Sequence, residues 1–274
     1  MEWFILSLIG LLAGTLGSLM GLGGGIIVVP ALIILSGYLA ILTGITPQVA
    51  VGTSLLIMIF TGLSSTLAYL KQKTVDLKSG WLFFAGSGPG ALVGVYFNNG
   101  IDPQLFLIFF GIFIIFVSFV LMIRKYLKPL KLTRRGIKRE YIDETGETIE
   151  YGYHPALALS IAFVVGMCSG LFGIGGGSLM VPAMILLFGF PAHRAIATSM
   201  FMILLSASLS SVTHIALGNV NWLYALALVP GAWFGGKLGA AINQRLKSDT
   251  IVNLLRIFLV IIGLRLIYQG IGIL

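Results

Sequence analysis

The stretch GLGGGIIVVP, residues 21–30, decides the fold, and it returns as GIGGGSLMVP at residues 173–182. The two copies start 152 residues apart (from 21 to 173) in a chain of 274 residues, so they open two similar halves. Within a helix each glycine costs about 0.5–1 kcal/mol relative to alanine. A glycine triplet in two apolar stretches therefore indicates two helix breaks in a duplicated membrane protein, where breaks at corresponding positions indicate a binding site.

The composition indicates an integral membrane protein. The chain is 58% hydrophobic and 9% charged, with a mean hydropathy of +1.04, whereas a soluble domain carries about 25% charged residues. Apolar runs of about 20 residues recur, and the strand-length alternation that a membrane barrel needs is missing. We predict an all-α, polytopic transmembrane helical bundle, located as a multi-pass protein in the cell inner (cytoplasmic) membrane.

The chain divides into three parts. Transmembrane repeat 1 covers residues 1–123, a charged cytoplasmic connector covers 124–154, and transmembrane repeat 2 covers 155–274. Each repeat is predicted to open with a glycine-broken hairpin and to continue with three spans: 3–37, 48–70, 80–98 and 104–123 in the first repeat, and 155–190, 195–217, 222–241 and 251–272 in the second. In the connector, alternation from Glu140 to Tyr151 around Thr145-Gly146 predicts a small β-hairpin.

The positive charges predict the orientation. Eleven of the seventeen Lys and Arg residues lie in Lys71–Lys78 and Arg124–Arg139, two loops that the positive-inside rule places in the cytoplasm. The rule holds in the second half only if its broken hairpin returns to the side where it starts. We therefore predict two inverted repeats with both termini outside. Half-helix and re-entrant versions of the hairpins stay open, although the roughly 12 apolar residues after each glycine cluster are short for a span.

The glycine clusters are candidate anion sites. The helix after each cluster begins with free backbone N–H groups and a partial positive charge, and such helix ends bind anions. Close packing through small residues is the structural alternative. Hydroxyl groups near the start of the next span could complete the site or bond to their own helix. The predicted substrate-binding residues are Gly24, Gly25, Thr53, Ser54, Gly176, Gly177, Ser178, Thr198 and Ser199.

Three basic residues are candidates for gating or coupling. His214 lies late in its span, and an ionisable residue within a membrane is a functional hypothesis by default, with a histidine bonded to a hydroxyl as the alternative. His193 and Arg194 lie at the start of the same span, where an interfacial snorkelling pair is the alternative.

Acidic residues are missing from the middle of every predicted span. All nine Asp and Glu residues fall in loops or at span ends, which disfavours a carboxylate proton relay and favours an anionic substrate. The single cysteine, Cys168, excludes a multi-cysteine metal site. The glycine clusters lack the Lys-Ser/Thr of a phosphate-binding loop, and no serine has a GxSxG context. We expect no enzyme activity, no cofactor, no metal and no nucleic-acid partner; the expected partners are a small anion and the lipid bilayer, and a homodimer stays open.

Taken together, these motifs resemble the TauE/SafE sulfite exporter family of membrane transporters. The resemblance rests on GTLGSLMGLGGGIIVVPAL and GMCSGLFGIGGGSLMVPAM, with VGTS and IATS in the following spans and HIALGNVNW after the second. It implies a secondary transporter for small sulfur-containing anions (sulfite, thiosulfate, sulfide or organosulfonates). An anion channel and a transporter of another small anion, such as a carboxylate, are the alternatives. Tyr69 stands in repeat 1 where repeat 2 has His214, so proton coupling, if present, would lie in the second half.

Overall fold

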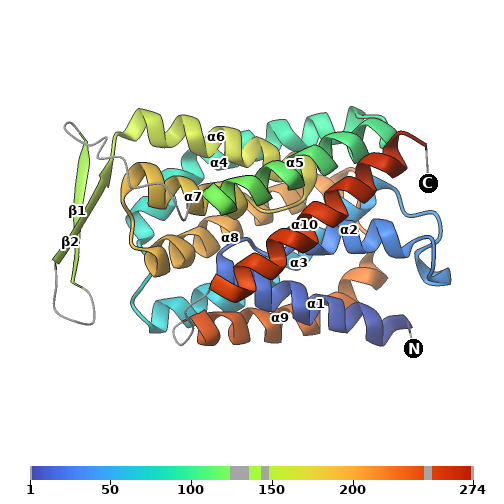
Figure 1. The fold of residues 1–274 in the computed structure, drawn as a ribbon, viewed down its shortest axis with the longest axis horizontal. Coiled ribbons are helices and arrows are strands. Elements are labelled where there is room, and N and C mark those ends of the chain that lie inside the picture. The colour runs from blue at the N-terminus through green and yellow to red at the C-terminus, as the bar shows by residue number, and fades with distance from the viewer. Residues whose placement is uncertain (1, 124–135, 143–147, 244–248, 273–274) are drawn as a thin grey trace.

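The computed structural model describes residues 2–123, 136–142, 148–243 and 249–272. Its helices follow the same order in both repeats, and a two-stranded sheet separates them (Figure 1). Repeat 1 contains α1 (Glu2–Met20), α2 (Gly25–Leu35), a short 3₁₀ turn (Ala40–Leu42), α3 (Pro47–Lys71), α4 (Leu77–Gly100) and α5 (Pro103–Ile123). Repeat 2 contains α6 (Pro155–Phe172), α7 (Gly177–Phe188), α8 (Ala192–Ala216), α9 (Trp222–Asn243) and α10 (Asp249–Gly270). Each predicted span coincides with a helix, and each predicted glycine break with a break between helices, to within a few residues.

The helix boundaries follow from local chemistry. Thr46 caps α3 by accepting the Val49 N–H at 3.3 Å, and Pro47 occupies the first turn, where a missing N–H costs nothing. Asp76 caps α4 in the same way through the Ser79 N–H at 3.1 Å. These caps fix where α3 and α4 begin, and therefore the positions of the polar residues at their starts, which are described below.

Six described helices are long and apolar enough to cross a membrane: α1, α3, α5, α6, α8 and α9. The predicted span α4 has 24 residues but is not among these six. The helices after the breaks are much shorter, with 11 residues in α2 and 12 in α7. At 1.5 Å per residue each covers about 16–18 Å of a hydrocarbon core about 30 Å thick. By length, both are half-helices.

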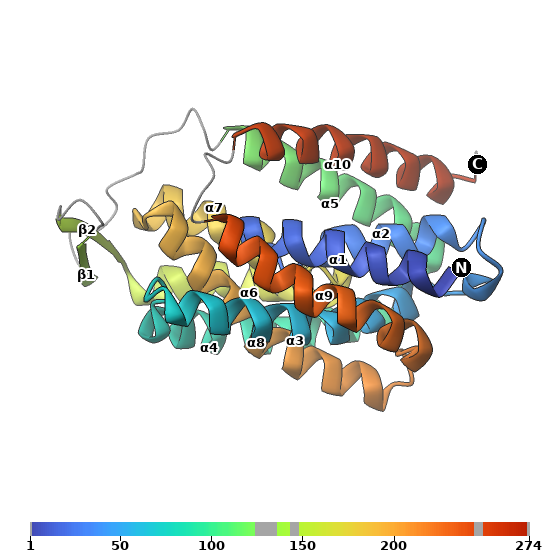
Figure 2. The same cartoon turned by 90° about the horizontal axis from the view of Figure 1, so that it is seen from below.

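The two repeats exchange their packing partners. Helix α1 packs along α9, and the corresponding α6 packs along α4; α3 packs against α8, and α5 against α10. Figure 2 shows the α5–α10 pair as a layer on one side of the remaining helices. Small residues permit the close contacts: a Cβ on Gly231 would lie 2.0 Å from the Ser7 carbonyl oxygen, and one on Gly90 would lie 2.1 Å from that of Phe163.

The chain ends and the sheet lie at opposite ends of the molecule (Figure 1). Strands β1 (Ile137–Ile142) and β2 (Thr148–Tyr153) pair antiparallel with Glu140 opposite Glu150, which confirms the predicted hairpin; its turn at Thr145-Gly146 lies outside the described residues. Helix α1 starts at the end with the termini and α6 starts at the sheet. This arrangement is what inverted repeats would produce, while their orientation in a membrane stays a prediction.

Candidate functional site

The two glycine tips, residues 21–24 and 173–176, have backbone conformations that favour glycine. Gly21, Gly23 and Gly24 have φ between 72° and 96° in the first tip, and Gly173 and Gly175 have φ of 68° and 59° in the second. A side chain at these φ values is strained. The left-handed residues end one helix and redirect the chain into the next within four residues, as the sequence predicts.

Direct contact joins the two tips. A Cβ added to Gly25 would lie 2.1 Å from the Gly173 carbonyl oxygen, and one added to Gly177 would lie 1.7 Å from that of Gly21. The contacts are reciprocal, because the first residue of each half-helix faces the first glycine of the opposite tip. No side chain fits at either position without displacing backbone. The packing role of these glycines, which the sequence left as an alternative, is therefore present in the structure.

The serines of the two Thr-Ser pairs tie each repeat to the opposite tip. Ser54 donates to the Gly173 carbonyl oxygen at 2.9 Å, and Ser199 donates to the Gly21 carbonyl oxygen at 2.7 Å. Both hydroxyls are fully buried. These bonds satisfy carbonyl groups that the glycine turns take out of the helix ladder.

The threonines make a second reciprocal pair of contacts. Thr53 accepts the Asn221 N–H at 3.1 Å, and Thr198 accepts the Asp76 N–H at 3.0 Å. Each bond joins α3 or α8 to the start of a helix from the other repeat. All four hydroxyls thus bond to backbone groups of the opposite repeat.

Ser178 differs from these hydroxyls. It is 1% exposed, occupies the first turn of α7, and its Oγ makes no hydrogen bond within the described residues. The corresponding residue of repeat 1 is the apolar Ile26, so the second tip alone carries this donor. Gly176 is the N-cap residue of α7, and Gly24 is that of α2; neither cap has a side chain to compete for the first N–H groups.

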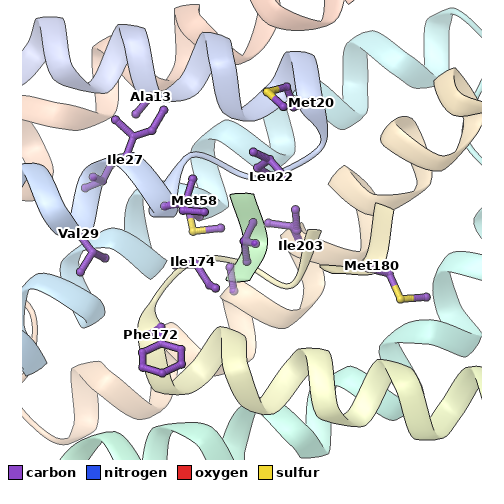
Figure 3. Packing of buried hydrophobic residues seen from close by; sticks show 14 of the residues in the cluster. Ala13, Met20, Leu22, Ile27, Val29, Met58, Phe172, Ile174, Met180 and Ile203 are labelled. Carbon is purple, nitrogen blue, oxygen red and sulfur yellow. The ribbon is translucent and has the colours of Figure 1, made fainter. Parts of the chain in front are cut away.

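Apolar side chains fill the space between the tips. The methyl group of Met58 lies 2.4 Å from a Cβ built on Gly23 and 1.9 Å from one built on Gly175, and Ile203 borders the same two glycines. Met58 and Ile203 occupy corresponding positions of α3 and α8. Figure 3 shows both converging with Leu22 and Ile174 where the chain turns. Methionine adapts its shape readily, so this contact can repack when the tips move.

Two of the three gating candidates, His193 and Arg194, lie at the end of the molecule that carries the sheet. Arg194 Nε donates to the Tyr151 hydroxyl at 2.9 Å, and the guanidinium lies 5.7 Å from the centre of that ring. His193 Nδ1 lies 2.8 Å from Asn243 Oδ1, and Asn243 in turn donates to the Leu19 carbonyl oxygen at 2.7 Å. Both side chains therefore contact other side chains of the protein.

A buried polar network around Asp76 was missed by sequence reasoning. Its carboxylate accepts the Ser79 hydroxyl at 2.6 Å and the Tyr151 hydroxyl at 2.9 Å, and Arg139 Nε lies 3.3 Å away. Tyr153 donates to Ser79 at 2.7 Å, which docks β2 against α4. The detectable signal was the capping pattern DLKS at residues 76–79, together with the two tyrosines on one face of β2.

The network shifts two pKa values. Burial alone would raise the pKa of Asp76, but the Ser79 and Tyr151 hydrogen bonds and the charge of Arg139 outweigh it, so the pKa lies below its usual value. Burial, followed by the Asp76 charge, raises the pKa of Tyr151 to about 12. The network is therefore built for an ionised carboxylate and a neutral phenol.

His214 lies in the last turn of α8 and is fully buried. Its ring lies beside the backbone of Gly170, but neither ring nitrogen makes a well-formed hydrogen bond within the described residues. In repeat 1 the corresponding Tyr69 donates to the Ser18 carbonyl oxygen at 2.9 Å. The predicted difference between the halves is thus a difference in hydrogen bonding as well as in residue type.

A groove of about 850 Å³ lies elsewhere, against α4 and α5. Aromatic side chains dominate its lining, including Tyr96, Phe109 and Phe116, and these three are exposed. It contains none of the predicted site residues.

The comparisons with known proteins agree with this architecture. The family described as sulfite exporter TauE/SafE matches residues 6–266. The chain belongs to the TauE/SafE family. It is 57% identical over 271 residues to the probable membrane transporter protein YunE of Bacillus subtilis, covering 99% of each chain. A probable membrane transporter protein of Methanocaldococcus jannaschii is 28% identical, covering 95% of this chain and 93% of its own. No solved structure matches the chain.

This membership makes the chain a multi-pass protein of the cell membrane and a transporter, because the family and the relatives carry transport names and no enzyme name. The names of the family and of these relatives do not establish which substrate this chain transports. The substrate class is therefore inferred from the chemistry of the residues at the glycine tips.

Proposed function

We propose that this TauE/SafE protein is a secondary transporter that moves small sulfur-containing anions, such as sulfite, thiosulfate, sulfide or organosulfonates, across the cytoplasmic membrane. The substrate binds between the two repeats, at the glycine tips, and alternates in access between the two sides. The sulfur class follows the family description, and the anionic character follows from the residues present.

The observation that carries the proposal is Ser178. Its buried hydroxyl is unpaired within the described residues and lies in the first turn of α7, where the backbone N–H groups lack partners within the helix. A hydroxyl donor beside a helix N-terminus presents several hydrogen atoms and a partial positive charge to one point. An oxyanion has several acceptor oxygens and matches this arrangement.

The charge distribution supports an anion over a cation. No Asp or Glu occurs inside α2 through α9, so no carboxylate competes for the donors or attracts a cation. At the end with the sheet, Arg139 and Arg194 exceed the single buried carboxylate of Asp76. The local excess of positive charge would raise the concentration of anions at this mouth.

The contacts between the tips support alternating access. Each tip is held by one serine and one glycine contact from the opposite repeat, and Met58 and Ile203 close the space between them. Because the contacts are reciprocal, a movement that loosens one set can preserve the other. A transporter needs two alternative sets of contacts of this kind, whereas a permanently open anion channel does not need them.

The first test is binding to purified protein in detergent. A ligand that binds only the folded state raises the unfolding temperature by mass action. We expect sulfite, thiosulfate or a small sulfonate to raise it in the parent protein and to lose most of that effect in Ser178→Ala. Acetate and lactate test the carboxylate alternative. Equal shifts with every anion, retained in Ser178→Ala, would contradict a specific site at this tip.

A further inference from the structure

A cluster of buried polar side chains in repeat 2 is not used by the site at the tips. We define the His214 cluster as Ser87, Ser169, Ser210, Ser211 and His214. Each residue is at most 1% exposed. Within the described part of the chain, the four serine hydroxyls make no hydrogen bond, and the His214 ring, which lies against the Gly170 backbone, makes none of good geometry. Buried polar groups are nearly always paired, because an unpaired one costs about 1–3 kcal/mol.

Contacts between helices bring these residues to one interface, formed by α4, α6 and α8. A Cβ on Gly166 would lie 2.1 Å from the Ser87 carbonyl oxygen, which fixes α6 against α4 at this level. His214 lies beside Gly170, one turn further along α6. His214 follows Ser211 by three residues and Ser210 by four, so each serine lies on the face of α8 that carries His214.

At the equivalent interface of repeat 1, Ser18, Ser65 and Tyr69 make hydrogen bonds, whereas Thr66, which corresponds to Ser211, makes none within the described residues. Ser65 donates to Ser18 at 2.8 Å, Ser18 donates to the Gly236 carbonyl oxygen at 2.8 Å, and Tyr69 donates to the Ser18 carbonyl oxygen at 2.9 Å. Ser65 and Tyr69 correspond in position to Ser210 and His214. The two repeats therefore differ at Ser210 and His214, whose counterparts Ser65 and Tyr69 have hydrogen-bond partners.

The imidazole is the one basic side chain of the cluster and the one that can take up a proton. The helices packed around it, α3, α4 and α6, supply no acidic side chain. Their charged residues are Lys71 and Lys78, both at the opposite ends of α3 and α4 from His214, and the ionisable Cys168 precedes Ser169 on α6. A buried imidazolium at this position has no counter-charge in the chain.

We propose that the His214 cluster is an internal proton-binding site whose counter-charge is the transported anion. A hydronium ion gives one proton to a ring nitrogen of His214, which breaks an O–H bond and forms an N–H bond, and the reverse transfer to a water molecule follows transport. On protonation the ring gains a second N–H donor, for which the unpaired serine hydroxyls of the cluster supply acceptors. The pairing with an anion rests on the proposed transport function, whereas proton binding does not.

The geometry connects this cluster to the tip. Gly170, beside the imidazole, precedes Gly173 by three residues on α6, or about 4.5 Å along the helix axis. Gly173 is the residue whose carbonyl oxygen holds Ser54. A charge on His214 thus lies about one helical turn from the second glycine tip. Mutual stabilisation of an imidazolium and an anion at this distance would make proton and substrate enter together.

The first experiment measures proton binding alone, on the full chain in nanodiscs. The protein carries three histidines, so the [¹³C]histidine NMR resonance absent from His214→Gln identifies His214. We expect this resonance to titrate reversibly between pH 4 and pH 9, with a midpoint moved by the double variant Ser210→Ala/Ser211→Ala. A resonance that stays neutral throughout this range overturns the proton site, whatever the transport results are.

The second experiment measures coupling in proteoliposomes, with thiosulfate and methanesulfonate as probes because their charge is constant from pH 5 to pH 9. An outside-acid pH gradient should raise uptake about tenfold in the parent protein and leave His214→Gln insensitive. Tyr69→Phe, the matched change in repeat 1, should respond to the gradient like the parent. An unchanged gradient response in His214→Gln would overturn the coupling. Absence of all anion flux in the parent would instead contradict the proposed function.

Discussion

At the residue scale, hydroxyl groups of the same kind have two different roles. Ser54 and Ser199 hold carbonyl oxygens of the opposite tip, whereas Ser178 has no partner within the described residues. A structural hydroxyl and a ligand-binding hydroxyl should therefore respond differently to removal. The sequence could place all three near the glycine clusters, but it could not show which of them the fold already uses.

The first prediction compares these serines. Ser54→Ala and Ser199→Ala each leave a buried carbonyl unpaired and should destabilise the protein by about 1 kcal/mol, the usual size for one hydrogen bond. Ser178→Ala removes no bond and should leave stability unchanged. Thermal unfolding in detergent without added anion checks both. Equal losses in all three variants would show that Ser178 also has a structural role.

The second prediction concerns the contact between the tips. Gly177→Ala places a Cβ 1.7 Å from the Gly21 carbonyl oxygen, which the backbone of both tips must move to accommodate. Overpacking of this kind costs about 1–3 kcal/mol or more. Gly100→Ala, where nothing lies within 4 Å, is the matched control. Size-exclusion chromatography and thermal unfolding should show a marked loss only for Gly177→Ala; a stable, transport-active Gly177→Ala protein would contradict the role given to the tips.

At the scale of elements, the connector sheet docks against the helices at one end of the membrane domain. Tyr151 and Tyr153 are at most 4% exposed and pack among Phe83, Phe188 and Phe190. The sequence predicted the hairpin from its alternation but treated the connector as a tether. Docking of a short sheet depends on contacts far apart in the chain, and no local pattern shows those contacts.

The third prediction tests this docking. Tyr151→Phe removes the hydrogen bonds to Asp76 and Arg194 and should increase hydrogen exchange in β2 and in the first turn of α8. Tyr96→Phe, at a tyrosine that is 79% exposed, should leave exchange unchanged. Hydrogen–deuterium exchange with mass spectrometry provides the measurement. Unaltered exchange in Tyr151→Phe would mean that the aromatic contacts alone hold the sheet.

The fourth prediction is the pH dependence of the same docking. Because the pKa of Asp76 is lowered in the folded protein, the ionised carboxylate stabilises the docking at pH values above 3.8, the ordinary pKa of the group, and this stabilisation is lost as the pH falls through the pKa of the folded state. Because the pKa of Tyr151 is raised, the neutral phenol stabilises the docking at pH values below 10.0, its ordinary pKa, and this stabilisation is lost as the pH rises through about 12. The distance between spin labels on β2 and α4 should be constant from pH 5 to pH 9 and increase only outside this window. An increase near pH 7 would assign the docking to another group.

At the scale of the whole molecule, the same order of helices and glycine breaks occurs in both halves of the chain. The positions of the helices and of the glycine breaks could be predicted from the sequence because hydropathy and glycine motifs are local. The exchange of partners between α1–α9 and α4–α6, the reciprocal tip contacts and the Asp76 network could not, because they arise from packing between distant segments. The sequence shows that Tyr69 of repeat 1 is replaced by His214 in repeat 2. Only the structure shows that the Tyr69 hydroxyl is hydrogen-bonded, whereas the His214 ring nitrogens lack a well-formed hydrogen bond.

The most direct test of the central claim is anion flux in proteoliposomes that contain the purified parent protein, Ser178→Ala or Gly100→Ala. The account predicts saturable uptake of at least one of sulfite, thiosulfate or methanesulfonate, accelerated when unlabelled anion is trapped inside, as exchange by alternating access requires. The same flux should persist in Gly100→Ala and fall at least tenfold in Ser178→Ala. Flux that does not saturate would indicate a channel, and full flux in Ser178→Ala, or none of any anion in the parent protein, would contradict the account.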